Sequence, residues 1–277
     1  MGTALQTSEE TSGALVIPSE LSFLAPCAVD DLIRVGRMQD GGYVLPEGLV
    51  RDTDMLISCG VSNEWSFDEH FARLRPGLII HAYDHTISRG EFARSFQRAL
   101  LKVSFGQTSL KDVRTRYKLL KAYETFFSAN ARHFEERIHN RMDRPNDTTL
   151  DKVFERTSSD KIFMKIDIEG SEYRIIDDIL KYSHRITGLA IEFHDTDPLR
   201  QVFISSVRKL QEQFEVVHFH ANNYAGVAED RLPDMLELTF ANKSRIQSKQ
   251  KRSNLPLPQA DFPCNPKLAD YQIHFLF

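Results

Sequence analysis

The sequence predicts an α/β fold in which a mostly parallel sheet is completed by a C-terminal antiparallel hairpin. Strand-like apolar runs alternate with segments of helical periodicity from residue 55 onward, and this alternation favours parallel strands joined by crossover helices. Residues 215–223 and 236–240 indicate two further strands with no helical period between them. Neighbouring strands without a crossover helix must pair antiparallel, so these two form the hairpin.

The composition is that of an ordinary globular protein. The chain has 277 residues, of which 41% are hydrophobic and 27% charged, and its formal net charge is −4. That balance gives no electrostatic basis for binding nucleic acid. No apolar run approaches the ~20 residues of a membrane span, and the polar N-terminus does not resemble a secretory signal. The three widely spaced cysteines argue against a disulfide framework, so we expect a cytoplasmic protein.

We expect a single domain over residues 31–277, preceded by a flexible segment over residues 1–30. The first twenty residues are rich in Ser, Thr and Glu, a composition typical of disordered chain. Within the domain, residues 88–140 are predicted to be a helical insertion, because apolar side chains recur there with the helical period. Residues 241–270 are basic and then proline-rich, which indicates a solvated loop and an extended segment.

An early turn is the first candidate for ligand contact. Asp40 is followed by two glycines and by the short apolar run Tyr43-Val-Leu45. Gly-Gly after Asp permits positive φ and favours a tight turn, so a hairpin at the sheet edge is the plainer interpretation. The functional alternative places Asp40 against a bound ligand.

A glycine turn follows the first buried strand of the α/β pattern. Residues 55–60 end in Gly60, a helix follows, and the next strand ends in Asp84. Gly60 lies 24 positions before Asp84, close to the ~20-residue offset between a glycine turn and a ribose-binding acid in dinucleotide sites. A glycine lets a ligand approach the turn closely, and the acid can accept ribose hydroxyl protons. This unit predicts a nucleotide-type cofactor site.

The helical insertion carries an excess of Lys and Arg between residues 111 and 121. A solvated helix face is the ordinary explanation, and a lid over an anionic substrate is the functional alternative. A third strand is expected within residues 131–138. Thr148 is predicted to cap the next helix, with Asp151 reaching back to the cap.

The central motif is the run Lys165-Ile-Asp-Ile-Glu-Gly170, which ends one strand and opens a helix over residues 171–181. Buried unpaired carboxylates are costly, so acids collect at the carboxyl ends of parallel strands, where α/β proteins bind ligands. The next two strands also end in polar groups, and the helix between them is predicted to begin at Asp197-Pro198. The three strand ends are expected to face one crevice with Asp167, Glu169, Glu192, His194, His220, Asn222 and Asn223.

Three motifs, in this order, resemble the FkbM family of S-adenosylmethionine-dependent methyltransferases. They are Thr149-Leu-Asp151, Met164-Lys-Ile-Asp-Ile-Glu-Gly-Ser-Glu172 and Ala190-Ile-Glu192. The stretches Asp40-Gly-Gly-Tyr43 and His220-Ala-Asn-Asn223 are similar to one branch of that family, which includes methyltransferase-like proteins of animals. The resemblance covers about residues 32–277, apart from the helical stretch.

The resemblance implies a class I methyltransferase fold, a Rossmann-like sheet of seven strands with the last antiparallel. It also implies methyl transfer from S-adenosylmethionine to an oxygen of a sugar, glycan or small natural product. The sequence departs from the main family pattern in carrying Ser58 where many members have an acid, and Glu64 where they have a second glycine. Carried over by position, the cofactor-binding residues are Ser58, Gly60, Val61, Ser62, Asp84 and Asp167.

Methyl transfer to a hydroxyl needs an acceptor in line with the sulfonium, a group that takes the hydroxyl proton, and exclusion of water. We hypothesise that His194 or Asp167 is the general base, and that Glu192 and His220 position the base or the acceptor. A second version places a divalent cation on Asp167, Glu192 and His194, where it would lower the pKa of the acceptor hydroxyl. The candidate substrate-binding residues are Asp40, Asn222 and Asn223.

Two other functions stay open at this level. A nucleotide-dependent oxidoreductase uses a similar sheet, but the C-terminal hairpin argues against it, and calorimetry with NAD against S-adenosylmethionine separates the two. A non-catalytic binding module would keep the fold, but it has no reason to keep so many costly polar groups at the strand ends. We expect a small-molecule or glycan substrate, no nucleic acid and no membrane span. The sequence indicates neither the acceptor nor the oligomeric state.

Overall fold

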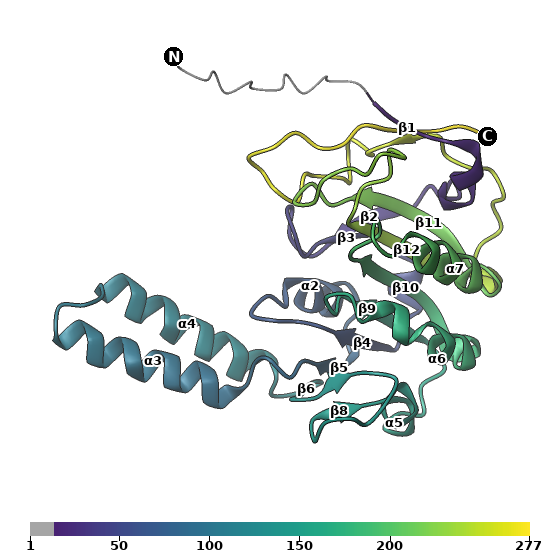
Figure 1. Ribbon diagram of the computed structural model, residues 1–277. Helices are drawn as coiled ribbons and strands as arrows, with labels where there is room; N and C mark the ends of the chain where they lie inside the picture. The colour runs from purple at the N-terminus through teal and green to yellow at the C-terminus, as the bar shows by residue number, and fades with distance from the viewer. Residues whose placement is uncertain (1–13) are drawn as a thin grey trace, which may run out of the picture.

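The computed structural model describes residues 14–277 and contains one central sheet (Figure 1). Its seven strands lie in the order β11-β12-β10-β9-β4-β5-β6. β12 runs antiparallel to both of its neighbours, and the other adjacent pairs are parallel, which confirms the predicted fold class. The strands are β4 (Met55–Cys59), β5 (Ile79–Tyr83), β6 (Ala131–Phe134), β9 (Ile162–Ile166), β10 (Ile186–Phe193), β11 (Phe214–Ala221) and β12 (Leu236–Asn242).

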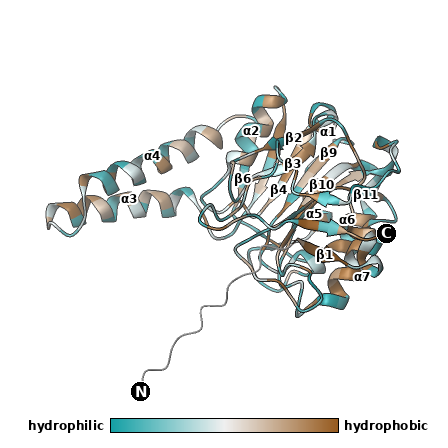
Figure 2. Ribbon diagram, turned by 90° about the horizontal axis from the view of Figure 1, so that it is seen from above, coloured by the Kyte–Doolittle hydropathy of each residue, from teal (hydrophilic) through white to brown (hydrophobic). Residues whose placement is uncertain are grey.

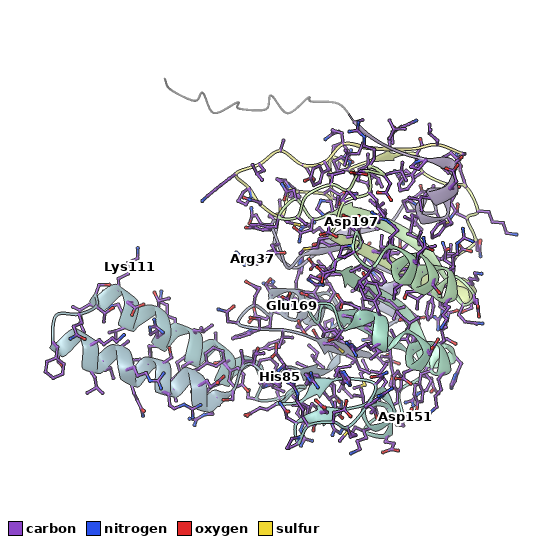
Figure 3. All side chains as sticks on the ribbon, viewed as in Figure 1. Arg37, His85, Lys111, Asp151, Glu169 and Asp197 are labelled. Atoms are coloured by element: carbon purple, nitrogen blue, oxygen red, sulfur yellow. The ribbon has the colours of Figure 1, made fainter. Side chains whose placement is uncertain are left out.

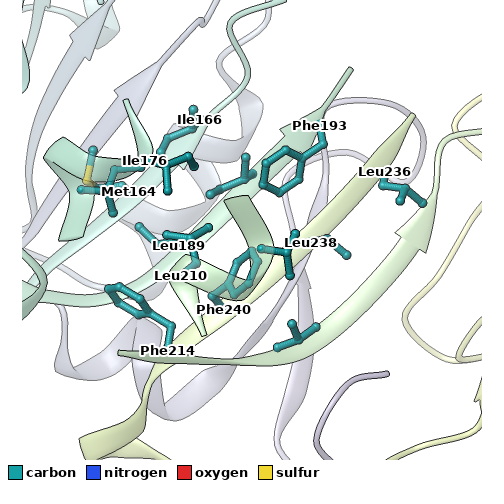
Figure 4. Close-up of a cluster of buried hydrophobic side chains, with 14 of the residues drawn as sticks. Met164, Ile166, Ile176, Leu189, Phe193, Leu210, Phe214, Leu236, Leu238 and Phe240 are labelled. Atoms are coloured by element: carbon teal, nitrogen blue, oxygen red, sulfur yellow. The ribbon is translucent and has the colours of Figure 1, made fainter. Parts of the chain in front are cut away.

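Alternate residues of the central strands face two different covering layers, as the period of two in a strand requires. On one face, Met164, Ile166 and Leu189 pack in a core with helices α5 (Leu150–Glu155), α6 (Ile176–Lys181) and α7 (Arg200–Leu210) (Figure 4). On the other face, Phe163 and Ala190 pack with side chains of α1 (Glu47–Asp52) and α2 (Ser66–Leu74). Because both faces are covered, the parallel strands are continuous apolar runs in the sequence.

The turn at Asp40 joins a two-stranded hairpin, as predicted. β2 (Leu32–Val35) and β3 (Tyr43–Pro46) pair antiparallel, and β3 contacts β11 and β12. The Thr239 hydroxyl of β12 donates to the Val44 carbonyl at 2.8 Å, which fixes the hairpin on the sheet. The loop with Asp40 is thereby held next to the ends of the central strands.

The helical stretch forms an arm that projects from the body of the protein (Figures 1 and 2). The arm consists of α3 (Arg89–Ser104) and α4 (Leu110–Phe126), which pack against each other. At its base, the Trp65 ring makes edge contacts with Phe92 and Phe127, with centroid distances of 6.2 and 5.6 Å. Lys111, labelled in Figure 3, lies near the far end of the arm and points away from it. The arm is thus anchored at the loop that follows β4.

The N-terminal prediction is wrong for part of its range. Residues 1–30 were expected to be flexible, but β1 (Leu15–Ile17) pairs with β14 (Ile273–Phe275), and a 3₁₀ helix (Ser19–Leu24) follows. Ile17 and Leu24 are fully buried, so this segment gains enough apolar contact to order. β13 (Asn254–Leu255) completes this small sheet. The rest of the prediction, residues 1–13, lies outside the described residues.

Three predicted helix starts also differ from the structure. Thr148 belongs to the short strand β8 (Asp147–Thr148), which pairs with β7 (Arg137–Ile138), and α5 begins after Thr149 without a side-chain cap. Asp151 instead accepts hydrogen bonds from Lys181 and Tyr182. α7 begins at Arg200 rather than at Asp197-Pro198, and the helix predicted over residues 171–181 is interrupted. That helix is divided into a 3₁₀ turn (Glu172–Arg174) and α6. Elsewhere in the described chain, 3₁₀ turns also occur at Ser183–Arg185 and Lys243–Arg245.

The ends of β4 and β9 meet in a close backbone contact. Gly60 has a φ of +77°, and a Cβ added there would overlap the carbonyl oxygen of Asp167. The Asp167 amide donates to the Cys59 carbonyl at 3.0 Å, and the Gly60 amide donates to the Tyr83 carbonyl at 2.9 Å. Only glycine has both the conformational freedom and the lack of a side chain that this crossing requires.

Replacing Gly60 by Ala is expected to destabilise the protein more than replacing Gly77 by Ala. Both glycines have positive φ, +77° and +86°, so each substitution carries the left-handed penalty of roughly 1–2 kcal/mol. A Cβ at Gly77 has nothing within 4 Å, whereas one at Gly60 overlaps backbone, which should cost a further 1–3 kcal/mol or so. Urea unfolding of both variants measures the difference. Equal losses would show that the crossing is not tight.

Candidate functional site

A cavity of about 640 Å³ lies at the carboxyl ends of β4, β5 and β9. Arg37, His85 and Glu169, labelled in Figure 3, come from three separate loops and all line it. The loop after β4, which holds Gly60, Val61 and Ser62 and is called the cofactor loop below, forms part of the cavity wall. The turn at Asp40, between β2 and β3, forms another part. Of the residues predicted from the sequence, the cavity is lined by Asp40, Gly60, Val61, Ser62, Asp84, Asp167 and Glu169.

The turns that follow three of the parallel strands have strained backbone. Ser62 after β4, Glu169 after β9 and Asp195 after β10 have φ values of 46°, 54° and 54°. Non-glycine residues adopt this left-handed region at a cost of order 1–3 kcal/mol, and such residues cluster at ligand sites. The sequence predicted polar groups at these strand ends, and the backbone there holds them in a conformation that packing alone would not favour.

Asp84 organises the cofactor loop. Its Oδ2 accepts from the Val61 and Ser62 amides at 3.1 and 2.7 Å. Its Oδ1 accepts from the amide and the hydroxyl of Thr86, at 2.7 and 2.6 Å. Burial opposes ionisation of Asp84, but these hydrogen bonds outweigh it and lower the pKa of the carboxyl. Asp84 is therefore an anion that ties the end of β5 to the loop after β4.

Ser58 is fully buried in β4 and does not line the cavity. The carboxylate beside this position comes from Asp68 of α2, which is 1% exposed and lines the cavity wall. Burial raises the pKa of Asp68 to about 6, although the Lys165 charge opposes this. The Ser58 hydroxyl also interacts with the Asp68 carboxylate and lowers its pKa, but Oδ1 itself makes no hydrogen bond within residues 14–277. Asp68 was not predicted as a site residue, because it lies between the core residues Phe67 and Phe71 of a helix.

Lys165 is the buried cation of the site. It lies inside an apolar strand, so its role was not predicted from the sequence. Its side chain is 6% exposed, and Nζ donates to the Gly60 carbonyl at 2.7 Å and to Asp167 Oδ2 at 3.0 Å. Burial alone would lower the pKa of Lys165, but the charges of Asp167 and Asp68 outweigh it and raise the pKa. Lys165 thus neutralises the carboxylates on both sides of the β4–β9 crossing.

His194 and Glu172 form a buried dyad at the end of β10. His194 Nδ1 lies 2.5 Å from Glu172 Oε1, and the Glu172 side chain is fully buried. The opposite ring nitrogen, Nε2, lies 3.6 to 4.0 Å from carboxylate oxygens of Asp167, Glu169 and Glu192. Burial would lower the pKa of His194, but the bond to Glu172 and the surrounding carboxylates raise it to about 9. In the sequence, Glu172 stood out only as the last residue of the family motif.

Glu192 is held from two directions and faces another acid. The Tyr43 hydroxyl donates to its Oε2 at 3.3 Å and the Asn222 amide to its Oε1 at 2.9 Å. Glu237 lies opposite it in the β10–β12 register. Burial, together with the charges of Asp167 and Glu237, raises the pKa of Glu192 well above the ordinary value. Glu192 is therefore the carboxyl of this group whose ionisation is most strongly opposed by its surroundings.

The other predicted residues of β11 point into the protein rather than into the cavity. His220 uses both ring nitrogens, with Glu237 at 2.9 Å and Asp270 at 3.1 Å. The Asn223 amide contacts the backbone of residues 265–269, and Asn222 holds Glu192. Both amides are thus engaged inside the protein, and their assignment to substrate binding stays a prediction.

Two groups of oxygen-rich side chains near the cavity could hold a cation. Asp167, Glu192 and His194 bring ligand atoms within 4.8 Å of one another, as the sequence-based hypothesis requires. Asp40, Glu192 and Glu237 do the same. The two groups share Glu192, and their donors are those that hard divalent cations prefer.

The sequence model of the Methyltransferase FkbM domain matches residues 45–224. The chain belongs to the FkbM methyltransferase family. No curated protein matches it significantly. Among solved structures, it is similar to precorrin-6y C5,15-methyltransferase of Geobacter metallireducens, at 14% identity over 71% of this chain and 86% of that one, with a TM-score of 0.34. Fibrillarin of Methanococcus jannaschii is 11% identical over 70% and 68% of the two chains, with a TM-score of 0.34. At these scores the likeness adds nothing to what the topology shows.

Family membership and sheet order together define this FkbM protein as a class I, S-adenosylmethionine-dependent methyltransferase. The carboxyl ends of β4, β5 and β9, where α/β enzymes bind ligands, are where the cavity lies. Among residues 14–277, no helix is long and apolar enough to cross a membrane.

The Glu172–His194 dyad should make stability depend on pH in alkaline solution. The folded-state pKa of about 9 lies above the ordinary 6.5, so the stabilisation is complete below pH 6.5 and is lost as the pH rises through 9. The difference corresponds to roughly 3 kcal/mol. Urea unfolding between pH 6 and 10 should show this loss in the wild type and much less of it in Glu172→Gln.

Glu169→Gln is the matched control, because Glu169 also lies near the His194 ring but its side chain is 87% exposed. That variant should retain the wild-type pH dependence. A Glu172→Gln variant that loses stability with pH as steeply as the wild type would contradict the role of the dyad.

Proposed function

We propose that this protein transfers the methyl group of S-adenosylmethionine to a hydroxyl group of a sugar, glycan or small natural product. The observation that carries the proposal is a buried oxygen of Asp68 that makes no hydrogen bond. It lies in the wall of a cavity close to the Glu172–His194 dyad. The first group is suited to the cationic cofactor, and the second to removing a proton from the acceptor.

The cofactor side of the cavity fits S-adenosylmethionine. Asp68 Oδ1 is free to accept from the α-ammonium group of the methionyl part, and the crossing at Gly60 lets the cofactor approach the backbone. Asp84 is placed for the ribose, because the Thr86 hydroxyl can rotate away and leave an Oδ1 lone pair to a ribose hydroxyl. When bound, the cofactor supplies an electrophilic methyl group on a sulfonium.

The acceptor side is rich in acids, which favours an uncharged polyhydroxyl compound. Carboxylates accept hydrogen bonds from hydroxyl groups and repel phosphates, so the cavity does not suit a nucleic-acid backbone. Asp40 and Glu169 are the exposed acids of this side. The acids in the cavity wall are Asp40, Glu64, Asp68, Asp84, Glu136, Asp167 and Glu169, against the bases Arg37, His85, Arg137 and Lys165.

His194 is our assignment for the general base. Glu172 fixes the ring through Nδ1, so Nε2 is the atom that takes a proton, on the side of Asp167 and Glu192. Because like charges destabilise a protonated ring, a sulfonium held near His194 would favour the neutral ring that acts as a base. Asp167 is the alternative base, but its Oδ2 is already paired with Lys165.

In the second version of the mechanism, a bound metal ion rather than a general base activates the acceptor hydroxyl. A divalent cation on Asp167, Glu192 and His194 would lower the pKa of the acceptor hydroxyl. Chelation followed by addition of Mg²⁺ separates the versions, since only the metal version loses turnover on chelation and regains it with Mg²⁺.

The two remaining alternatives have less support. An oxidoreductase would bind NAD, but β12 is antiparallel in this sheet and the family transfers methyl groups. A binding module would take up S-adenosylmethionine without turning it over, so a measured turnover excludes it.

Asp68→Asn should weaken binding of S-adenosylmethionine by about 2 kcal/mol or more, because the cofactor ammonium loses a buried counter-charge. Isothermal titration calorimetry measures the affinity, with NAD titrated in parallel. Glu69→Gln, one position along α2 and outside the cavity wall, should bind as the wild type does. Undiminished binding by Asp68→Asn would remove this residue from the site, and tighter binding of NAD would overturn the cofactor assignment.

The pH profile of kcat/KM distinguishes the two candidate bases. With His194 as base, kcat/KM should rise with pH until it levels off near the free-enzyme pKa of about 9, and His194→Gln should lose this rise together with most activity. With Asp167 as base, Asp167→Asn should abolish turnover and His194→Gln should keep the wild-type pH profile. Release of S-adenosylhomocysteine with a panel of sugar and glycan acceptors measures the rate. Full turnover in both variants would overturn the assignment.

A further inference from the structure

A third cluster of candidate ligands lies outside the cavity, where the hairpin strands meet the C-terminal segment (residues 255–272). His220 of β11 and Glu237 of β12 are opposite each other in register, and Cys264 of the C-terminal segment lies against both. Their ligand atoms are within 4.8 Å of one another, and all three side chains are buried. His220 was a sequence-based candidate for positioning the base, but the mechanism proposed above assigns no step to these three side chains.

We propose that His220, Glu237 and Cys264 bind a zinc ion that fastens the C-terminal segment to the sheet. The donor set is an imidazole nitrogen, a carboxylate oxygen and a sulfur, the three kinds of ligand that protein-bound zinc takes. A thiol among them selects zinc over magnesium or calcium, which take oxygen ligands.

The distances already approach those of a tetrahedral site. Cys264 Sγ lies 3.9 Å from His220 Nδ1 and 3.4 Å from Glu237 Oε1, and His220 Nδ1 lies 2.9 Å from Glu237 Oε2. Zinc bonds of ~2.0–2.3 Å at tetrahedral angles hold ligand atoms roughly 3.3–3.7 Å apart. Movements of a few tenths of an ångström therefore suffice to place an ion between the three donors.

The second nitrogen of His220 has the partner that zinc-binding histidines need. Asp270 Oδ2 lies 3.1 Å from His220 Nε2, and the Asp270 side chain is only 10% exposed. A carboxylate in this position keeps the proton on Nε2 and leaves Nδ1 free to bind a metal. Asp270 and His220 thus have the arrangement in which a carboxylate orients a metal-binding histidine.

The charges around the group also favour a cation. Glu237 faces Glu192 across β10 and β12, and the two share a neighbour in Asp40, whose carboxylate oxygen lies within 4.8 Å of theirs. Buried like charges at this separation repel strongly unless a cation lies nearby. A divalent ion beside Glu237 relieves that repulsion.

The C-terminal segment is the part of the chain that such a clamp would stabilise. It holds little regular structure, and besides the apolar contacts of Leu255, Leu257 and Tyr271 it is attached by polar contacts such as those of Asn223 with residues 265–269 and of His218 with Asp261. Cys264 is fully buried at its centre. One ion at this point joins β11, β12 and the segment, and zinc binding releases the thiol proton of Cys264.

The full-length protein, purified without chelators and dialysed against metal-free buffer, should contain one zinc ion per chain by elemental analysis. Replacement by Co²⁺ should produce a thiolate-to-cobalt charge-transfer band, which Cys264→Ser should abolish. Cys27→Ser is the matched control, since Cys27 is also buried but lies beside Glu215, outside the group. His194→Gln should keep both zinc and the band, which separates this site from the cavity.

Asp270→Asn tests the proposal without removing a ligand, in case Cys264→Ser fails to fold. Competition with a chromophoric chelator should show about 10- to 100-fold weaker zinc binding in this variant. Chelation should also lower the melting temperature of the wild type but not that of Cys264→Ser. Zinc-free wild type that binds neither Zn²⁺ nor Co²⁺, or a charge-transfer band that persists in Cys264→Ser, would overturn the site.

Discussion

The backbone crossing of Gly60 and Asp167 is the contact on which the rest of the site depends. It brings the ends of β4 and β9 together, while the Gly60 amide ties in β5 through the Tyr83 carbonyl. Lys165 donates hydrogen bonds to both the Gly60 carbonyl and the Asp167 carboxylate. It thereby holds the two strand ends together and compensates the charge of Asp167. Because these strand ends are fixed, the cofactor loop and the central acid keep one relative position, which methyl transfer requires for in-line geometry.

The interior of this protein holds many acids, and several of them have a specific partner. Lys165 compensates Asp167, His194 compensates Glu172, and Tyr43 and Asn222 donate hydrogen bonds to Glu192. A buried pair is worth little as a source of stability, but removing one member leaves an uncompensated charge. The same arrangement raises the pKa of both His194 and Glu192, and shifts of this kind are how a site obtains an acid and a base at one pH.

Part of the candidate site was predictable from local sequence, and part was not. Asp167 and the Gly60 loop line the cavity as predicted, because polar groups at the ends of parallel strands meet at one edge. The roles of Asp68, Lys165 and Glu172 were not predicted, because Lys165 lies inside an apolar strand and the two acids stand at helix starts, where charged residues are common. Ser58 was predicted to touch the cofactor, yet it is buried behind the wall that Asp68 completes.

The sequence by itself determined the parallel sheet and its antiparallel C-terminal hairpin, because these depend on the hydrophobic period. It also determined the family and the glycine turn, because these depend on short motifs. Helix starts at residues 148 and 197 were misplaced, since local capping signals compete with tertiary contacts such as that of Asp151 with Lys181. Tertiary structure alone decided that Glu172 holds His194 and that Cys264 reaches His220. Those pairs lie 22 and 44 residues apart, and only the packing of distant segments brings such side chains together.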